Sequence, residues 1–164
     1  MKNITMIAAI GKNNELGKDN QLIWPIKEDL KFFKEQTINK PIVMGINTFN
    51  SLPGILPQRK HFVLTSRNLD LAKEVVICHS IEDILKQTEE FEEVMIIGGA
   101  SIYRQFLDYA NKLVLTEIAA EEKEADAYFP DFNHDEWNCE ILSNNIENNI
   151  HYKHVIYTRK KIQK

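Results

Sequence analysis

Six short apolar runs, separated by segments with helical patterns, place the strongest constraint on the fold of this chain. Continuous apolar runs of roughly four to eight residues are typical of strands that are buried on both faces of a sheet. When amphipathic helical segments separate such strands, the pattern indicates a mostly parallel sheet covered by helices on both sides. The runs cover residues 4–10, 41–45, 61–65, 75–77, 94–97 and 113–116.

Helical patterns occupy four of the five segments between these six apolar runs. The predicted helices follow Trp24-Pro25, cover residues 47–52, begin after Ser80 and follow Gly98-Gly99. Ser80 is a candidate N-cap, because an acidic residue stands three positions after it. The last helix has an apolar face made of Ile102, Tyr103, Phe106 and Ala110.

The carboxyl-terminal part follows a different pattern. Residues 137–142 and 151–158 resemble two strands, and asparagines crowd the segment between them (Asn144, Asn145, Asn148 and Asn149). This pattern predicts an antiparallel hairpin at one sheet edge. The predicted architecture is therefore a three-layer α/β fold. It has a mostly parallel central sheet of about eight strands, an antiparallel edge hairpin and helices on both faces. At 164 residues, the whole chain (1–164) is expected to form one domain.

Charge and apolar length exclude several classes of partner. The net charge is -4 and the cations are scattered, which argues against a nucleic-acid partner. No apolar stretch reaches membrane-spanning length, and the run at residues 4–10 is too short for a signal peptide, so a cytoplasmic location is expected. No surplus apolar stripe is evident, so the chain is expected to be a monomer.

Cysteine and histidine spacing gives no sign of a metal site. Cys78 and Cys139 are isolated, as suits a reducing compartment, and Cys78 ends an apolar run and is expected to be buried. None of the five histidines has the spacing of metal ligands. His151 and His154 fall in the last predicted strand and are expected at an edge or on the surface.

Asp29 is the leading candidate for chemistry. It lies in the first predicted helix, on the apolar stripe formed by Ile26, Leu30 and Phe33. Loss of solvation raises the pKa of a carboxyl group and allows proton exchange near neutral pH. The alternative is that this acid only favours the positive end of a helix that begins near Pro25.

Small, polar or cationic residues follow three of the predicted strands. The three segments are Gly45-Ile46-Asn47-Thr48, Thr65-Ser66-Arg67 and Gly98-Gly99-Ala100-Ser101. Glycines at a strand-to-helix turn let a ligand approach the backbone, and free helix amides bind phosphate. Neither the GxGxxG nor the GxxxxGK[ST] pattern occurs, so tight connections and simple helix caps remain alternatives. Arg59 could clamp a carboxylate with its planar fork, or be a solvated surface residue.

With these residues in view, the chain resembles bacterial dihydrofolate reductases over essentially its whole length. Each matching segment is weak alone, but their order and spacing are jointly specific. The matching segments are Ile7-Ala8-Ala9; Leu16-Gly17 with Asn20; Trp24 with Asp29-Leu30 and Phe33-Lys34; Pro41-Ile42-Val43-Met44-Gly45 with Thr48-Phe49; Leu56-Pro57 with Arg59-Lys60; Ile97-Gly98-Gly99 with Ile102-Tyr103; Leu115-Thr116; and Tyr128-Phe129-Pro130-Asp131.

The resemblance implies NADPH-dependent reduction of 7,8-dihydrofolate to tetrahydrofolate, for one-carbon metabolism. Asp29 would bind the amino group and ring nitrogen of the pterin and favour a protonated ring. Thr116 would hydrogen-bond Asp29 and the ligand, and Trp24 would pack over the site and orient water. The proton would reach the ring nitrogen through water.

Binding residues carry over from the same resemblance, and no metal ligand does. Arg59 would pair with the glutamate carboxylate of folate. The remaining substrate contacts would be Ile7, Ala8, Leu30, Phe33, Leu52, Leu56, Ile97 and Tyr103. The cofactor contacts would be Ala9, Leu16, Gly45, Asn47, Thr48, Thr65, Ser66, Arg67, Gly98, Gly99, Ala100, Ser101, Ile102 and Tyr103. The Gly98-Gly99 peptide is expected to be cis, and the polar loop at residues 11–21 would be a lid over the nicotinamide.

Some positions depart from the family pattern. Ile46 stands where many bacterial relatives have an arginine that contacts cofactor phosphate, and Arg67 would supply that charge instead. Ile23 replaces a proline before Trp24, Pro25 follows that tryptophan, and Ala100 and Ala125 replace glycines. Two other readings compete with the reductase: a pyrimidine reductase of riboflavin synthesis, and a folate- or nucleotide-binding module without turnover. The Asp29 helix and Arg59 argue against the first, since both would serve a pterin-glutamate substrate. The joint presence of Asp29, Trp24, Gly98-Gly99 and Thr116 argues against the second.

Overall fold

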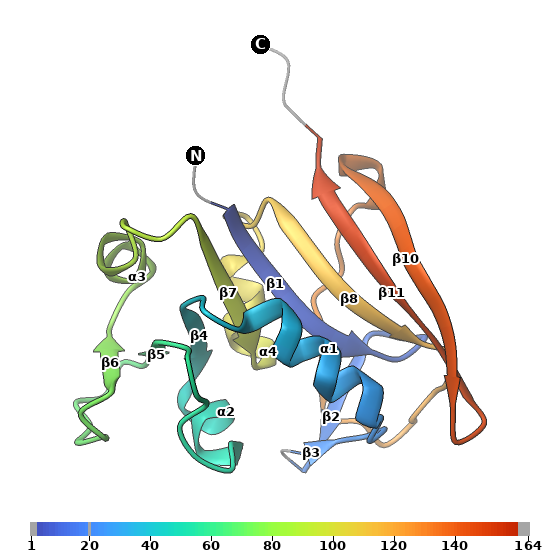
Figure 1. The fold of residues 1–164 in the computed structure, drawn as a ribbon, viewed down its shortest axis with the longest axis horizontal. Helices are drawn as coiled ribbons and strands as arrows, with labels where there is room; N and C mark the ends of the chain where they lie inside the picture. Colours follow the sequence, from blue (N-terminus) through green and yellow to red (C-terminus); the bar gives the residue numbers. More distant parts are fainter. Residues whose placement is uncertain (1–2, 20, 161–164) are drawn as a thin grey trace.

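A computed structural model describes residues 3–19 and 21–160, so Asn20 of the matching segment lies outside the described residues. An eight-stranded sheet forms the middle layer, with strand order β10-β11-β8-β1-β7-β4-β5-β6 (Figure 1). Its strands are β1 (Asn3–Ile10), β4 (Ile42–Gly45), β5 (His61–Leu64), β6 (Val75–Cys78), β7 (Glu93–Gly98), β8 (Lys112–Ile118), β10 (Trp137–Glu147) and β11 (Ile150–Arg159). The six apolar runs therefore form β1, β4, β5, β6, β7 and β8, as predicted.

The sheet is mostly parallel and has an antiparallel edge. Strand β1 pairs in parallel with β7 and with β8. Strand β4 pairs in parallel with β7 and with β5, and β5 pairs in parallel with β6. Strand β11 pairs antiparallel with both β8 and β10. This arrangement confirms the predicted fold class, including the hairpin at the edge.

Helices cover both faces of the sheet. They are α1 (Lys27–Thr37), α2 (Ile46–Ser51), α3 (Ile81–Gln87) and α4 (Ala100–Phe106), and a short 3-10 helix covers His134–Glu136. Phe32 of α1 and Phe49 of α2 pack into one apolar cluster, while Ile84 of α3 and Ile102 of α4 pack into another. The first cluster lies between the sheet and the α1–α2 layer, where most of the predicted substrate residues come from. Within the described ranges, no helix is long and apolar enough to cross a membrane.

Three local predictions are confirmed, one by a hydrogen bond and two by burial. The Ser80 hydroxyl accepts a hydrogen bond of 3.0 Å from the Asp83 backbone N–H and so caps α3. On α4, Ile102, Tyr103 and Phe106 are buried, and Ala110 is buried just beyond the helix end. Cys78 is fully buried, as expected.

The hairpin turn is narrower than the asparagine-rich segment suggested. Only Asn148 and Asn149 form the turn, with φ values of 52° and 64°. Asn144 and Asn145 belong to β10 instead, where they pair with Lys153 and Tyr152. The correction has a simple cause: a two-residue hairpin turn needs only two residues with positive φ, so the other asparagines extend the strand.

The predicted polar loop at residues 11–21 also contains regular structure. Strands β2 (Glu15–Lys18) and β3 (Gln21–Leu22) join β9 (Ala127–Tyr128) in a separate three-stranded sheet. The carboxylate of Glu15 is buried and accepts hydrogen bonds from the backbone N–H groups of Asn13 (2.6 Å) and Glu122 (2.7 Å). The lid segment is therefore attached to the segment before β9 by the hydrogen bond from Glu122 to the Glu15 carboxylate.

Leu30 contradicts the predicted apolar stripe of α1. Ile26 is buried and Phe33 is half-buried, but Leu30 is 57% exposed. The helix contacts the sheet through Phe32 and Phe33. Successive helix residues turn by about 100°, so Leu30 lies about 200° from Phe32, and Leu30 is not among the residues packed against the sheet clusters.

Candidate functional site

The predicted cofactor residues that follow β4, β5 and β7 lie at one edge of the sheet. Strands β7, β4 and β5 are parallel neighbours, so their carboxyl ends lie side by side. A Cβ atom built at Gly45 would lie 3.0 Å from Ile102 Cγ1, and one at Gly99 would lie 3.5 Å from Thr48 Oγ1. The segments after β4 and β7 are thus in contact, as the strand-end pattern predicted.

Gly98 occupies a position that only glycine fits well. Its φ is 119°, and a Cβ atom there would lie 3.2 Å from the Tyr103 hydroxyl oxygen. The Gly98-Gly99 peptide is cis, as expected. No side chain caps the N-terminus of α2 or α4, so the amides of Asn47, Thr48 and Ala100 to Ile102 face a position open to an acceptor.

Two basic side chains lie beside the segment after β5. Ser66 and Arg67 are exposed, and the Arg67 backbone N–H donates to Thr65 Oγ1 at 3.2 Å. His79, which no pattern in the sequence singled out, lies beside them, with its Nδ1 2.8 Å from the Thr65 carbonyl oxygen. Ile46, by contrast, packs against the apolar cluster below α1 and α2. The basic side chains near an anionic ligand at this edge are therefore Arg67 after β5 and His79 after β6, whereas the residue after β4 is the apolar Ile46.

Five predicted substrate residues gather in one apolar cluster. Its members from the prediction are Ile7, Phe33, Leu52, Leu56 and Ile97, which pack around buried Met44, Val63 and Val114. Leu30 is exposed near this cluster and belongs to none of the packed groups.

Ala8 and Tyr103 pack on the opposite side of the sheet, with the α3–α4 cluster. The Tyr103 hydroxyl donates to the Ile7 carbonyl at 2.6 Å, and burial raises its pKa, which keeps it a neutral donor. This hydrogen bond links the cofactor edge to β1.

Asp29 lies at the junction of α1, β8 and β11. Its side chain is 20% exposed, the buried Thr116 hydroxyl donates to its Oδ1 at 2.5 Å, and His154 Nε2 lies 3.2 Å from the same oxygen. Thr116 pairs with Ala9 of β1 on one side and with His154 of β11 on the other. The structure thus brings the predicted acid and its predicted partner together, and adds a histidine.

His154 corrects the expectation that both late histidines lie at an edge or on the surface. His151 is exposed, but only 8% of His154 is accessible. Its ring stacks on Phe32, with centroids 3.7 Å apart and planes 7° apart. A signal existed in the sequence: Tyr152 and Ile156 stand two positions either side, so alternation places this histidine on an inward face.

Trp24 stands beside the start of the lid. It is half-buried and packs, with Ala9, on the small cluster of Ile26, Ile118 and Tyr152. A Cβ atom at Gly11 would lie 2.5 Å from Trp24 Cη2. Leu16 of the lid packs instead on the α3–α4 cluster.

Arg59 is partly engaged within the chain. Its Nε donates to the Pro57 carbonyl at 3.0 Å, and its Nη1 donates to the buried Thr37 hydroxyl at 3.1 Å. Burial lowers the pKa of its guanidinium. Since a guanidinium has five N–H donors, this anchoring leaves others for a carboxylate next to Leu56.

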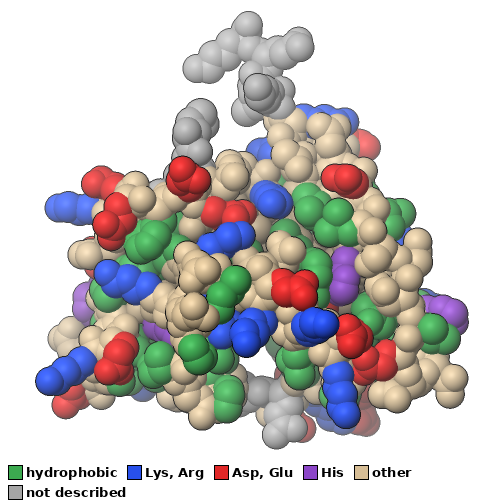
Figure 2. All heavy atoms as spheres, viewed as in Figure 1, with side chains coloured by type: hydrophobic (Ala, Val, Ile, Leu, Met, Phe, Trp, Pro, Cys, Tyr) green, Lys and Arg blue, Asp and Glu red, His purple; other side chains and the backbone are tan. Residues whose placement is uncertain are grey.

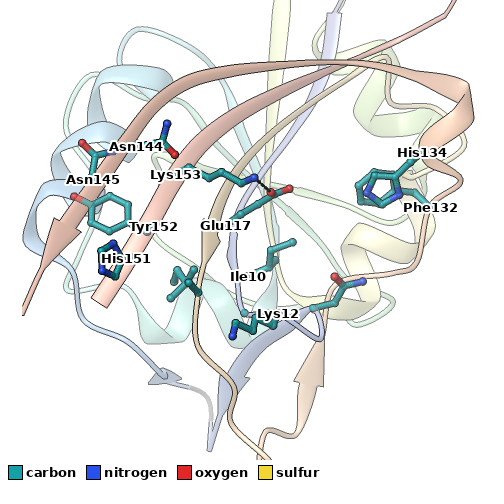
Figure 3. A pocket seen from close by; sticks show the side chains of 14 residues that line it. Ile10, Lys12, Glu117, Phe132, His134, Asn144, Asn145, His151, Tyr152 and Lys153 are labelled. Carbon is teal, nitrogen blue, oxygen red and sulfur yellow. Dashed lines mark ion pairs between the residues drawn. The ribbon is translucent and has the colours of Figure 1, made fainter. Parts of the chain in front are cut away.

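The site is an open cleft, and a separate cavity lies elsewhere in the molecule. Figure 2 shows the molecule hollowed between α2 and the β2–β3 segment. A cavity of about 480 Å³ lies instead between the start of the lid, the end of β8 and the β10–β11 hairpin, where Lys153 pairs with Glu117 at 3.6 Å (Figure 3). Asp29 does not line it. Among the described residues, no group of three His, Cys, Asp or Glu side chains is placed to hold a metal ion.

Comparisons with known proteins agree with this geometry. The family model described as dihydrofolate reductase matches residues 3–159. A dihydrofolate reductase of Haemophilus influenzae is 39% identical over 137 residues, covering 84% of each chain. One of Buchnera aphidicola from Acyrthosiphon pisum is 44% identical over 131 residues, covering 79% of this chain and 80% of its own length. One of Bacillus subtilis is 34% identical over 164 residues, covering 98% of this chain and 97% of its own.

Proposed function

Because this chain belongs to the dihydrofolate reductase family, we propose that it reduces 7,8-dihydrofolate to 5,6,7,8-tetrahydrofolate with NADPH as reductant. The family implies a nicotinamide cofactor and a small-molecule substrate. The tetrahydrofolate would serve one-carbon metabolism. The chain would act as a single-domain monomer.

The observation that carries the proposal is the Asp29 carboxylate at the rim of an apolar cluster. Thr116 and His154 both contact its Oδ1. The cluster beside it contains Ile7 and Phe33, which suit a flat aromatic ring. A dihydropterin offers an amino group and a ring N–H side by side, and a carboxylate is the matching acceptor.

In the proposed reaction, a hydride and a proton add across a C=N bond of the dihydropterin. When bound, the cofactor supplies the hydride. The negative charge of Asp29 favours a protonated pterin ring, and the proton reaches the ring nitrogen through water held under Trp24. The chain's own task is then to bind, orient and exclude bulk water, since orientation carries much of such a rate.

The cofactor would lie along the edge formed by β7, β4 and β5. Gly98, Gly99 and Gly45 leave room there for close backbone approach, and the uncapped amides of α2 and α4 suit phosphate oxygens. Arg67 and His79 would meet the extra phosphate of NADPH, because Ile46 is committed to the apolar cluster.

At the substrate's other end, Arg59 would pair with the glutamate carboxylate. Its two anchoring hydrogen bonds, to Pro57 and Thr37, hold the guanidinium plane in a fixed direction. A preorganised fork loses less entropy on binding a carboxylate than a free one.

The test is loss of NADPH absorbance in the presence of purified protein, with and without dihydrofolate. Oxidation that depends on dihydrofolate supports the proposal. A folded protein that binds NADPH but oxidises it only with a pyrimidine of riboflavin synthesis would overturn it. Binding of both ligands without oxidation would favour a module that lacks turnover.

A further inference from the structure

His154 is held in one orientation beside Asp29. Its side chain is 10% exposed, and its ring lies against Phe32 of α1 with nearly parallel planes. Its Nε2 lies 3.2 Å from Asp29 Oδ1, and its Nδ1 lies 3.3 Å from the Ser143 hydroxyl oxygen of β10. The imidazole therefore bridges the predicted acid and the edge hairpin.

The direction of one hydrogen bond at this bridge depends on the protonation of the imidazole. Asn145 Nδ2 donates to Ser143 Oγ at 2.9 Å. An ionised carboxylate only accepts, so the His154 nitrogen next to Asp29 must carry a hydrogen. In a neutral imidazole the other nitrogen then accepts from the Ser143 hydroxyl. In an imidazolium both nitrogens donate, and the Ser143 oxygen accepts instead. Asp29 keeps its donor in either state.

We propose that His154 is a positioning residue that fixes Asp29 Oδ1 and switches the charge of the Asp29–His154 pair between negative and neutral. The inference rests on the proposed function. With a neutral His154, the full negative charge of Asp29 favours the protonated pterin. With a protonated His154, the ion pair weakens that field. Protonation of His154 therefore opposes the rise in hydride-transfer rate that acidity otherwise gives a protonated substrate.

Among the described residues, Asp29 is the charged side chain that contacts the His154 ring. On α1 the facing groups are Asp29 and apolar Phe32, and Thr116 of β8 and Ser143 of β10 are uncharged. Tyr152 of β11 has its ring centroid 5.5 Å away. Its pKa is raised by burial and by the charges of Glu147, Glu28 and Asp29, so the phenol stays neutral where an imidazole titrates.

Two substitutions separate the two parts of the role. His154→Gln keeps an amide donor for Asp29 but takes up no proton, and His154→Phe keeps an aromatic ring against Phe32 but has no donor. His151→Gln is the matched control, because His151 is an exposed histidine three positions earlier on the same strand. The readout is the single-turnover rate of hydride transfer between about pH 5 and 8, the range in which imidazoles gain charge.

The expected results differ between the variants. In the wild type and in His151→Gln, the rate should level off on the acid side, whereas in His154→Gln it should keep rising. At neutral pH, His154→Gln should bind an antifolate pterin analogue within a few-fold of the wild type. His154→Phe should bind it about tenfold more weakly, since one hydrogen bond to a charged group is worth roughly 1.5 kcal/mol. Identical pH profiles of the wild type and His154→Gln would overturn the proposal.

A nitrogen NMR spectrum of the imidazole in the ligand-free protein gives an independent readout. A neutral ring protonated at Nε2 is expected, and one protonated at Nδ1 would overturn the proposed hydrogen-bond direction. This measurement does not depend on turnover. A wild type that shows the Nε2 tautomer but never oxidises NADPH with dihydrofolate would overturn the proposed function, and the positioning role of His154 in that reaction with it.

Discussion

Thr116 donates its hydroxyl hydrogen to Asp29 Oδ1 over 2.5 Å, and this contact joins the sheet to the helix that carries the acid. Thr116 is buried in β8 and paired on both sides, by Ala9 and His154. Its position is therefore fixed by the most enclosed part of the sheet. The hydrogen bond therefore holds the Asp29 carboxylate in place, although the next residue of the same helix, Leu30, is largely exposed.

Replacing Asp29 with asparagine should preserve the fold and NADPH binding but lower turnover at neutral pH by about 10²–10⁴-fold. The amide carries no charge to favour a protonated pterin. The residual rate should recover at low pH, where solvent protonates more of the substrate. Steady-state rates across pH measure this effect. Glu28→Gln, an exposed acid in the same helix turn, should leave the rate unchanged. Normal neutral turnover in Asp29→Asn would remove Asp29 from the mechanism.

Arg67→Ala should weaken NADPH binding more than NADH binding, because the lost charge acts on the extra phosphate alone. A charged hydrogen bond is worth roughly 1.5–3 kcal/mol, so the preference should fall by at least about tenfold. Fluorescence titration with both cofactors gives the ratio of dissociation constants. Arg104→Ala, an exposed arginine on α4, serves as the control. If both cofactors are weakened equally, Arg67 does not contact that phosphate.

Tyr103→Phe should lower the free energy of unfolding by about 1 kcal/mol, since the buried Ile7 carbonyl loses a donor at 2.6 Å. Urea denaturation measures this difference. Tyr109→Phe is the matched change at the end of the same helical segment, where the side chain is 45% exposed, and it should cost almost nothing. Equal effects of the two substitutions would show that the Tyr103 hydroxyl contributes nothing to stability.

Glu93 should make stability depend on pH on the acid side. Burial alone would raise its carboxyl pKa, but hydrogen bonds from Lys40 (2.7 Å) and Thr5 (2.6 Å) and the charge of Lys112 lower it below 4.5. A lowered pKa means that the folded state binds the proton less tightly than the unfolded state. The stabilisation is therefore complete above the unfolded value and is lost as pH falls through the folded one.

Glu93→Gln should consequently cost about 1–2 kcal/mol of unfolding free energy at neutral pH, and progressively less below about pH 4. Denaturation curves at several pH values measure the difference from the wild type. The neighbouring exposed acid gives the control, Glu92→Gln, which should show no such pH dependence. A constant difference between Glu93→Gln and the wild type at all pH values would contradict the assigned shift.

Patterns in the sequence predicted the features that depend on neighbouring residues: strands, a helix cap and a buried cysteine. The apolar runs became strands, Ser80 became a cap and Cys78 became buried, because each depends on residues close in sequence. Leu30 and His154 were misplaced because their surroundings come from distant elements. The packing of α1 on the sheet through Phe32 and Phe33 decides the exposure of Leu30. The register of β11 against β8 brings His154 next to Asp29. Neither can be obtained from spacing within one segment.

The resemblance to a family added what spacing could not, since it linked Asp29 to Thr116 across more than half the chain. The structure confirms this contact. The family resemblance gave no role to His154 or His79, and their contacts with Asp29 and Thr65 were found only in the structure. Such positions become visible only when the fold brings their partners within hydrogen-bond distance.

The placement of β1 has a consequence for synthesis. This first strand (Asn3–Ile10) lies between β7 and β8, whose residues begin at Glu93 and Lys112. A nascent chain shorter than this has an apolar strand with both edges unpaired, and such edges readily join other chains. The core around β1 can therefore close only after β8 (Lys112–Ile118) has been synthesised. Until then, β1 depends on factors at the ribosome that shield exposed strands from other chains.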